Sequence, residues 1–168
     1  MEHEEYMRQA LELARLAMAE GEVPVGCVIV RDGAVVGRGR NRRETAQTAL
    51  GHAELEAIAQ ACRTLGGWRL AGCALYVTLE PCPMCAGAII NARIPRVVFG
   101  APDPKAGSCG SVTDLFALPY NHRPACEGGV LEEECSQLLR DFFRALRLAP
   151  PKPRWKPAVL PAQGGDHA

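Results

Sequence analysis

Short apolar runs alternate with amphipathic segments along most of this 168-residue chain, and this alternation most narrows the folds open to it. β-branched residues at 25–30 and the run ALYVTL at 74–79 predict strands, and residues 97–99 predict another short one. Apolar residues at helical spacing lie between and around these runs. Strands that alternate with crossover helices predict a layered α/β domain with parallel strand pairs.

Turn and helix-end signals place the remaining elements. Asp32-Gly33 has the chemistry of a hairpin turn, so residues 25–30 and 34–36 predict an antiparallel hairpin at one end of the sheet. The polar stretch that follows predicts a loop. Helices are predicted at 4–20, 52–65, 81–92 (with Pro81 in its first turn) and 131–148, with one short helix near 112–118.

The length and the C-terminal composition indicate one domain followed by a tail. A chain of 168 residues suits a single domain with a sizeable core. Residues 1–148 form the expected domain. Residues 149–168 hold many prolines and few core residues, which predicts a tail, and this tail is basic. The acidic start lacks the compact apolar segment of a secretory signal, and no apolar run would span a bilayer. We therefore expect a cytoplasmic protein without a membrane anchor.

Charge is balanced overall but uneven along the chain. Nineteen Lys and Arg residues match nineteen Asp and Glu residues. Residues 138–156 nevertheless hold six cations against the single anion Asp141, and four arginines lie within 38–43. Local basic patches on a neutral protein can contact a phosphate backbone, although a merely solvated surface would have the same composition.

Only two of the eight cysteines, Cys82 and Cys85, form a close pair. Cys27, Cys62 and Cys73 lie in apolar runs and are expected to be small core residues. Without an export signal, a reducing compartment fits better than a disulfide framework. A lone CxxC is also compatible with a thiol redox pair, whereas a zinc ribbon would require a second CxxC, which the chain lacks.

His52 and the cysteine pair each begin a predicted helix that follows a strand. Such helix starts lie at the carboxyl ends of parallel strands, so one nitrogen and two sulfurs can converge there. Three protein ligands leave zinc one position for a water, which is the catalytic form of a zinc site. We expect one Zn²⁺ with a bound water or hydroxide, held by His52, Cys82 and Cys85.

Glu54 is expected to move protons beside this metal. Zinc lowers the pKa of bound water to about 7, and a nearby carboxylate can take the water proton and return it to the substrate. Residues two apart on a helix point to different sides, so Glu54 is not expected to be a ligand alongside His52. Any single first-turn Glu would also stabilise its helix dipole, but H-x-E followed by P-C-x-x-C is the signature of zinc nucleobase deaminases.

Further stretches extend this match over nearly the whole chain to about Leu148. They are EVPVGCVIV, GHAELEAI, LYVTLEPCPMCAGAIINARIPRVVFGA, DPKAGSCGS, NHR and DFFR, and with them the chain resembles the bacterial tRNA-specific adenosine deaminases of the TadA type. The resemblance implies a three-layer α/β/α deaminase fold whose central mixed sheet has about five strands flanked by helices. It also implies hydrolytic conversion of adenosine to inosine at the wobble position of a tRNA anticodon, in a cytoplasmic homodimer with one zinc per subunit.

The resemblance implies the metal ligands and the proton donor named above, and it adds two substrate-binding residues. Asn41 corresponds to the pocket asparagine that hydrogen-bonds the flipped base, and Asp103 to a position near the RNA backbone. Without the resemblance, both would be interpreted as turn-forming residues. The chain departs from the family pattern at Cys109, where some relatives have a small residue without a thiol, and in the tail after Ala149.

Two other functions remain open from the sequence. A deaminase of a free base or nucleoside (guanine, cytosine or cytidine) needs only a closed pocket, whereas a tRNA loop also needs an open rim and phosphate contacts. The arginines at 38–43 and the basic last helix favour RNA. A non-catalytic, zinc-stabilised binding module is the second alternative, but it leaves Glu54 without a task.

Overall fold

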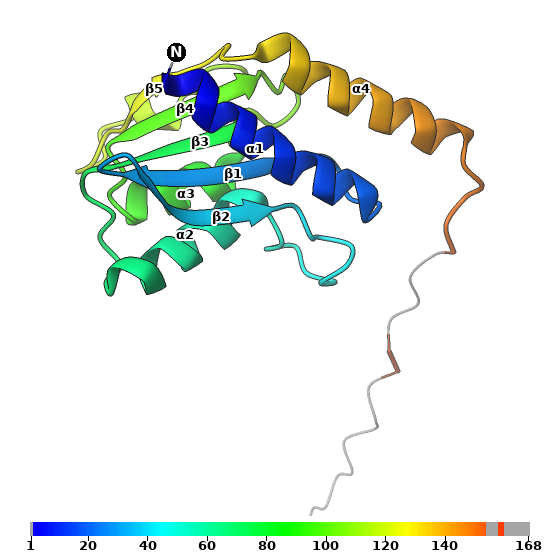
Figure 1. Ribbon diagram of the computed structural model, residues 1–168, viewed down its shortest axis with the longest axis horizontal. Coiled ribbons are helices and arrows are strands. Elements are labelled where there is room, and N and C mark those ends of the chain that lie inside the picture. The colour runs from blue at the N-terminus through cyan, green and yellow to red at the C-terminus, as the bar shows by residue number, and fades with distance from the viewer. Residues whose placement is uncertain (1, 154–157, 160–168) are drawn as a thin grey trace, which may run out of the picture.

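The computed structural model describes residues 2–153 and 158–159 as three stacked layers (Figure 1). The elements are α1 (Glu2–Ala19), β1 (Gly26–Arg31), β2 (Ala34–Arg40), α2 (Ala53–Leu65), β3 (Cys73–Leu79), α3 (Pro83–Asn91), β4 (Arg96–Ala101), η1 (Leu115–Ala117), β5 (Ala125–Glu127) and α4 (Glu132–Leu148). The predicted α/β/α fold with a mixed five-stranded sheet is confirmed. Much of the predicted tail at 149–168 lies outside the described residues, so the domain boundary at 148 stays a prediction.

The direction of the strands gathers the predicted site residues at one edge of the sheet. The strand order is β2-β1-β3-β4-β5, with β1 antiparallel to both neighbours and β3, β4 and β5 parallel to one another. Strands β2, β3 and β4 therefore all end at the edge where β1 begins. Asn41 follows β2, Cys82 follows β3 and Asp103 follows β4, so residues far apart in sequence reach the same edge.

Each face of the sheet is covered by two helices. Helices α1 and α4 lie on one face and α2 and α3 on the other (Figure 1). Along β1, Cys27 and Ile29 pack toward α2 and α3, whereas Val28 and Val30 pack toward α1. Because both faces are buried, β1 and β3 have the nearly continuous apolar runs seen in the sequence. None of the helices in the described part of the chain combines the length and apolar character that a membrane crossing requires.

The hairpin forms where it was predicted, but its second strand is longer. Asp32 and Gly33 both have positive φ (50° and 75°), as a two-residue hairpin turn of this kind requires. Strand β2 continues beyond residues 34–36 to Arg40, through a stretch that the sequence analysis took for a loop. The reason is that the buried Gly37 and Gly39 alternate with the exposed Arg38 and the half-buried Arg40, so this stretch lacks the apolar side chains by which strands are usually found.

Two further elements differ from the prediction. Helix α3 begins at Pro83 rather than at Pro81, because Cys82 is the N-cap and its carbonyl accepts the first helical hydrogen bond, from Ala86 N at 2.9 Å. Pro83 then occupies a first-turn position, where its missing N–H costs nothing. Strand β5 was not predicted, since its three exposed residues carry no hydrophobic pattern and form a strand only by pairing with β4.

Gly39 sets how closely α2 approaches β2, and its replacement tests this packing. A Cβ at position 39 would lie 2.1 Å from the carbonyl oxygen of Ala53, in the first turn of α2. We expect Gly39→Ala to lower the free energy of unfolding by about 1–3 kcal/mol, measured by urea denaturation, because the helix must shift outward. Gly67→Ala is the control, since a Cβ there meets no atom within 4 Å. Equal stability of the two variants would contradict the close packing of α2 on β2.

Candidate metal centre and catalytic cavity

His52 and Cys82 occupy equivalent positions at the starts of α2 and α3. Both are N-cap residues with extended backbones, at φ −95° and ψ 146° for His52 and φ −75° and ψ 174° for Cys82. Neither side chain caps its own helix. Both side chains are therefore available to a shared site, which Cys85 completes from the first turn of α3.

The three predicted ligands come together with distances that suit a tetrahedral metal. His52 Nδ1 lies 3.6 Å from Cys82 Sγ and 3.5 Å from Cys85 Sγ, and all three ligand atoms are within 4.8 Å of one another. Typical zinc–sulfur and zinc–nitrogen bond lengths in a tetrahedral site place nitrogen and sulfur about 3.6 Å apart. The donor set therefore fits zinc. Among the described residues, it is the one cluster of at least three His, Cys, Asp or Glu side chains so placed.

The pKa values of the three side chains favour binding of a cation. Hydrogen bonding from the Cys85 thiol, together with contact with His52, lowers the pKa of Cys82 to about 4. The pKa of Cys85 is raised because its thiol donates to Cys82 and is largely buried. The pKa of His52 is raised chiefly by its contact with Cys82. Cys82 is thus a thiolate at neutral pH, and a metal ion would displace the proton that Cys85 retains.

Glu54 lies beside this cluster, in the first turn of α2. Its side chain is only 4 % exposed, and burial raises its pKa to about 7. The carboxyl group also contacts the Cys85 thiol, but it is not one of the three clustered ligands. A buried carboxyl with a pKa near 7 is able both to accept and to donate a proton at neutral pH.

A cavity of about 210 Å³ opens next to His52 and Cys82. Its lining residues come from the strand ends and helix starts at this edge of the sheet: Val23, Val25, Asn41, Arg43, His52, Ala53, Leu79, Glu80, Cys82, Asp103 and Ala106. Both predicted substrate-binding residues, Asn41 and Asp103, are thus on its wall. A substrate in this cavity would therefore contact the metal cluster at His52 and Cys82 and, at the same time, Asn41 and Asp103.

Asn41 and Asp103 are both tied to neighbouring backbone. The Asn41 side-chain amide donates to Val23 O at 3.2 Å, and its oxygen accepts from Arg43 N at 3.2 Å. Asn41 keeps one amide hydrogen and one lone pair for a ligand. The Asp103 carboxylate accepts from Lys105 N at 3.0 Å and Ala106 N at 3.3 Å, so it shapes its own loop.

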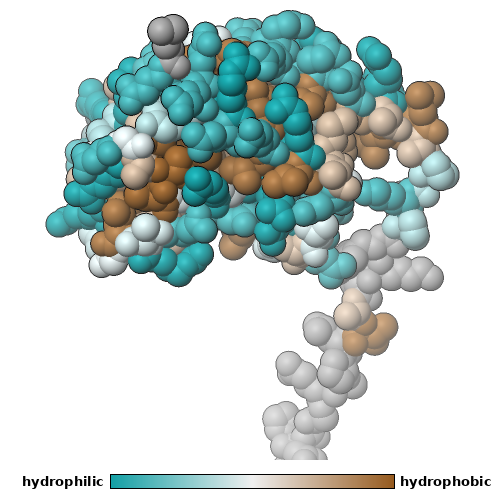
Figure 2. Space-filling model, in the orientation of Figure 1, coloured by the Kyte–Doolittle hydropathy of each residue, from teal (hydrophilic) through white to brown (hydrophobic). Residues whose placement is uncertain are grey.

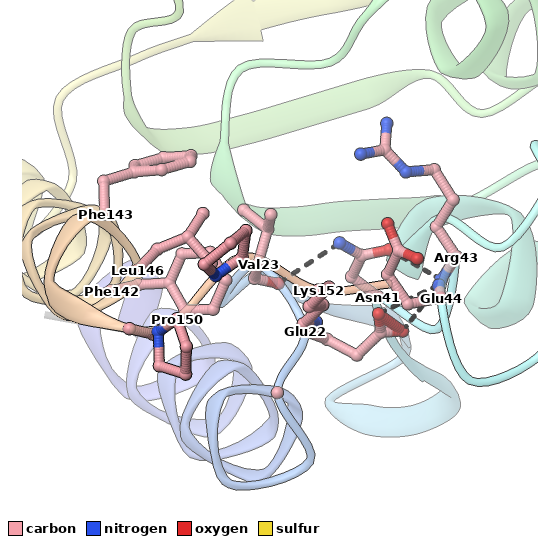
Figure 3. A pocket seen from close by; sticks show the side chains of 13 residues that line it. Glu22, Val23, Asn41, Arg43, Glu44, Phe142, Phe143, Leu146, Pro150 and Lys152 are labelled. Atoms are coloured by element: carbon pink, nitrogen blue, oxygen red, sulfur yellow. Dashed lines mark hydrogen bonds between the residues drawn. The ribbon is translucent and has the colours of Figure 1, made fainter. Parts of the chain in front are cut away.

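A second cavity, of about 430 Å³, adjoins the first and shares Val23, Asn41 and Arg43 with it. Figure 3 shows Phe142, Phe143 and Leu146 of α4 on one side of it and Asn41, Arg43 and Glu44 on the other. The cations of α4 were evident from the sequence, whereas the part played by these aromatic residues in a cavity was not predicted. Phe142 and Leu146 lie four residues apart on the same helix as the arginines, and this spacing could have indicated an apolar surface there.

Basic side chains border a third cavity, of about 610 Å³, which shares Phe143 and Leu146 with the second. Lys105, Arg140, Arg144 and Arg147 are its cations. In Figure 2, apolar side chains (brown) lie among polar ones (teal) over the C-terminal part of α4, at the right of the view. The cavity beside the metal cluster therefore adjoins a surface that is first aromatic and then cationic.

The fold and the cluster together define a deaminase of the three-layer α/β/α class: a histidine and two cysteines meet at adjacent helix starts beside a buried glutamate. The chain belongs to the MafB19-like deaminase family, whose model matches residues 1–147.

Individual relatives agree with this assignment. The chain is 50 % identical over 143 residues to the tRNA-specific adenosine deaminase of Bacillus subtilis (strain 168). This match covers 84 % of this chain and 89 % of the relative. A solved structure from work on A-to-I editing by tRNA:A34 deaminases at the wobble position of transfer RNA superimposes with a TM-score of 0.78 at 45 % identity, covering 80 % of this chain and 99 % of that one. Guanine deaminase from Bacillus subtilis is more distant, with a TM-score of 0.60, 36 % identity, and coverage of 93 % and 100 %.

Proposed function

We propose that this protein is a zinc-dependent hydrolytic deaminase that converts adenosine to inosine at the wobble position of a tRNA anticodon. The observation that carries the proposal is the convergence of His52, Cys82 and Cys85 beside the buried Glu54, with His52 and Cys82 on the wall of a cavity. The relatives named above support adenosine in tRNA as the substrate.

The residues of the chain divide the chemical work between them. His52, Cys82 and Cys85 would hold one Zn²⁺, which when bound supplies Lewis-acid activation of the attacking water at neutral pH. Glu54 would accept the proton of that water and deliver it to the adenine ring nitrogen. It would then take the proton of the hydroxyl group added to the ring and pass it to the amino group, which departs as ammonia. Burial of Glu54 excludes bulk water from this proton transfer.

Asn41 and Asp103 are proposed to position the substrate. The free amide hydrogen and lone pair of Asn41 would hydrogen-bond the base that enters the cavity. Asp103 lies on the opposite loop and would contact the RNA near its backbone, mainly through the loop conformation that its carboxylate maintains.

The surface beside the cavity favours an RNA loop over a free base. Unpaired RNA bases are bound by stacking on aromatic side chains, and the backbone by cations. Phe142 and Phe143 supply the first, and the cations beside the third cavity supply the second. The likeness to guanine deaminase keeps a free-base substrate as the second candidate. A binding module without catalysis would not need a buried carboxyl at Glu54.

A panel of substrates tests this proposal. Metal-loaded protein is incubated with an anticodon stem-loop carrying a wobble adenosine, and separately with adenosine, guanine, cytosine and cytidine, and the products are identified by mass spectrometry. Inosine formed in the RNA, with at most slow turnover of the free compounds, is the expected result. Turnover of guanine or another free compound without reaction of the RNA would favour the second candidate.

The arginines of α4 should contribute to RNA binding through charge. Replacing Arg144 and Arg147 with Ala is expected to weaken binding of the stem-loop. It should also flatten the plot of log K against log salt by about 0.7–1 for each arginine that contacts phosphate. Arg63→Ala, on the exposed last turn of α2, removes one positive charge away from α4 and is the control against which each single arginine change is compared. An unchanged salt dependence in the double variant would show that α4 does not contact the RNA backbone.

We also infer a cytoplasmic homodimer with one zinc per subunit. This inference follows from the family resemblance. The domain of residues 1–148 would carry the catalytic activity, in agreement with the family match over 1–147. The proline-rich residues 149–168 would then form a separate tail.

A further inference from the structure

Two carboxylates at the site edge of the sheet are almost completely buried and have no role in the chemistry above. Glu22 precedes β1 and is 1 % exposed, and Glu80 follows β3 and is 2 % exposed. A buried carboxylate destabilises the folded protein strongly unless it is paired or well hydrogen-bonded. Neither forms a salt bridge within the part of the chain that the structure describes. Their partners are loop amides.

Glu80 is the hub of the loop at 103–111. Its carboxylate accepts the backbone N–H of Asp103 at 3.3 Å and those of Cys109 and Ser111 at 3.1 Å each. The hydroxyl of Ser111 donates to the same carboxylate. One side chain thus holds the loop at both its beginning and its end.

Gly107 shows how closely this loop is fitted over the carboxylate. A Cβ at position 107 would lie 2.1 Å from Glu80 Oε2, so any side chain there would displace the carboxylate or the loop. Ser108 N donates to Pro81 O at 2.9 Å, which ties the loop to the residue just before Cys82. The wall of the cavity formed by Asp103 and Ala106 is therefore built directly on Glu80.

Glu22 holds the opposite loop in the same manner. Its two carboxylate oxygens accept the N–H of Glu44 at 2.9 and 3.1 Å (Figure 3), and one of them also accepts the N–H and the hydroxyl of Thr45, both at 3.3 Å. This loop begins at Asn41 and carries Arg43, both on the wall of the catalytic cavity. Each wall of the cavity thus depends on one buried carboxylate.

We propose that Glu80 and Glu22 are positioning residues, which hold the 103–111 loop and the 41–45 loop at the spacing that the substrate requires. The proposal rests on the proposed deaminase function. An apolar side chain of similar size would fill either position at a lower cost in desolvation. The carboxylates instead place their acceptors against several loop amides, and these loops carry lining residues of the cavity.

Glu80→Gln tests the proposal with little change in volume. The side-chain NH₂ of Gln cannot accept from a backbone N–H, so the loop loses part of its attachment. We expect kcat/KM for the stem-loop to fall about 10–100-fold, mainly through a higher KM, because the wall of the cavity shifts. Metal content should not change. Amide hydrogen exchange at Cys109 and Ser111 should become about tenfold faster.

Gly107→Ala perturbs the same attachment from the loop side. It should reproduce the rise in KM, and combined with Glu80→Gln it should add little further effect, because both changes break one interaction. Glu22→Gln should speed exchange at Glu44 and Thr45 but not at Cys109 or Ser111. Gly67→Ala, which meets no neighbouring atom, is the control for the glycine change.

These readouts separate positioning from a general loss of stability. A lower melting temperature in Glu80→Gln and Gly107→Ala, with wild-type KM and wild-type exchange at Cys109 and Ser111, would overturn the proposal. So would simply additive effects on KM in the double variant. If the wild-type protein makes no inosine, the proposed function fails, and the exchange rates of the metal-loaded variants still decide whether the carboxylates hold these loops.

Discussion

Glu54→Gln is expected to reduce deamination by about 10²–10⁴-fold while the protein keeps its metal. Gln has nearly the same shape and fills the same buried position in the first turn of α2, but it cannot accept the water proton and return it. Because Glu54 is not one of the three clustered ligand atoms, metal content measured by plasma mass spectrometry should equal that of the wild type. Binding of the RNA should also change little, since Gln keeps the shape and volume of the side chain that it replaces.

Glu56→Gln is the matched control, because Glu56 lies two residues further along the first turn of the same helix. Glu56 contacts Arg40 N and pairs with Arg42, away from the cluster, so this variant should react at nearly the wild-type rate. Near-normal turnover of Glu54→Gln would remove Glu54 from the mechanism. Loss of metal from Glu54→Gln would instead place its carboxylate among the ligands.

Cys82→Ser and His52→Ala are each expected to lose the metal and with it all measurable deamination. A serine hydroxyl stays protonated at neutral pH and is a poor zinc ligand, whereas Cys82 is already a thiolate because its pKa is lowered to about 4. Removing His52 leaves two sulfurs, which is too few to hold zinc in a catalytic site. Metal content and inosine formation should therefore fall together in both variants.

Cys126→Ser controls for the loss of a thiol, because Cys126 is exposed on the edge strand β5, outside the cluster. It should keep both metal and activity. Full metal occupancy in Cys82→Ser or His52→Ala would contradict the assignment of the ligands, whatever the activity of the variant.

The layers of the fold could be predicted from the sequence because local signals agree with the tertiary structure. Buried strands have continuous apolar runs, and Asp32-Gly33 marks the hairpin. The end of β2 and all of β5 could not be predicted in this way. Gly37 and Gly39 are buried without apolar side chains, and β5 exists only because it pairs with β4.

The metal cluster was predictable for a topological reason. Helix starts after parallel strands share one edge, so His52 and the cysteine pair had to be neighbours once the strand order was right. The burial of Glu80 was not predicted. Its position, as a charged residue directly between an apolar strand and PCxxC, could have indicated a special role. Its burial depends on a loop more than twenty residues away folding back over it. The second cavity, beside α4, likewise joins segments about 100 residues apart.

The most direct test of the central claim is the position of inosine in RNA treated with the metal-loaded protein. Two anticodon stem-loops of equal length are compared, one with its only loop adenosine at the wobble position and one with that adenosine moved by one nucleotide. Fragment mass spectrometry, with the reaction run in ¹⁸O-labelled water, should find labelled inosine at the wobble position of the first RNA and none in the second. Unreacted wobble adenosine, or equal reaction of both RNAs, would contradict the account.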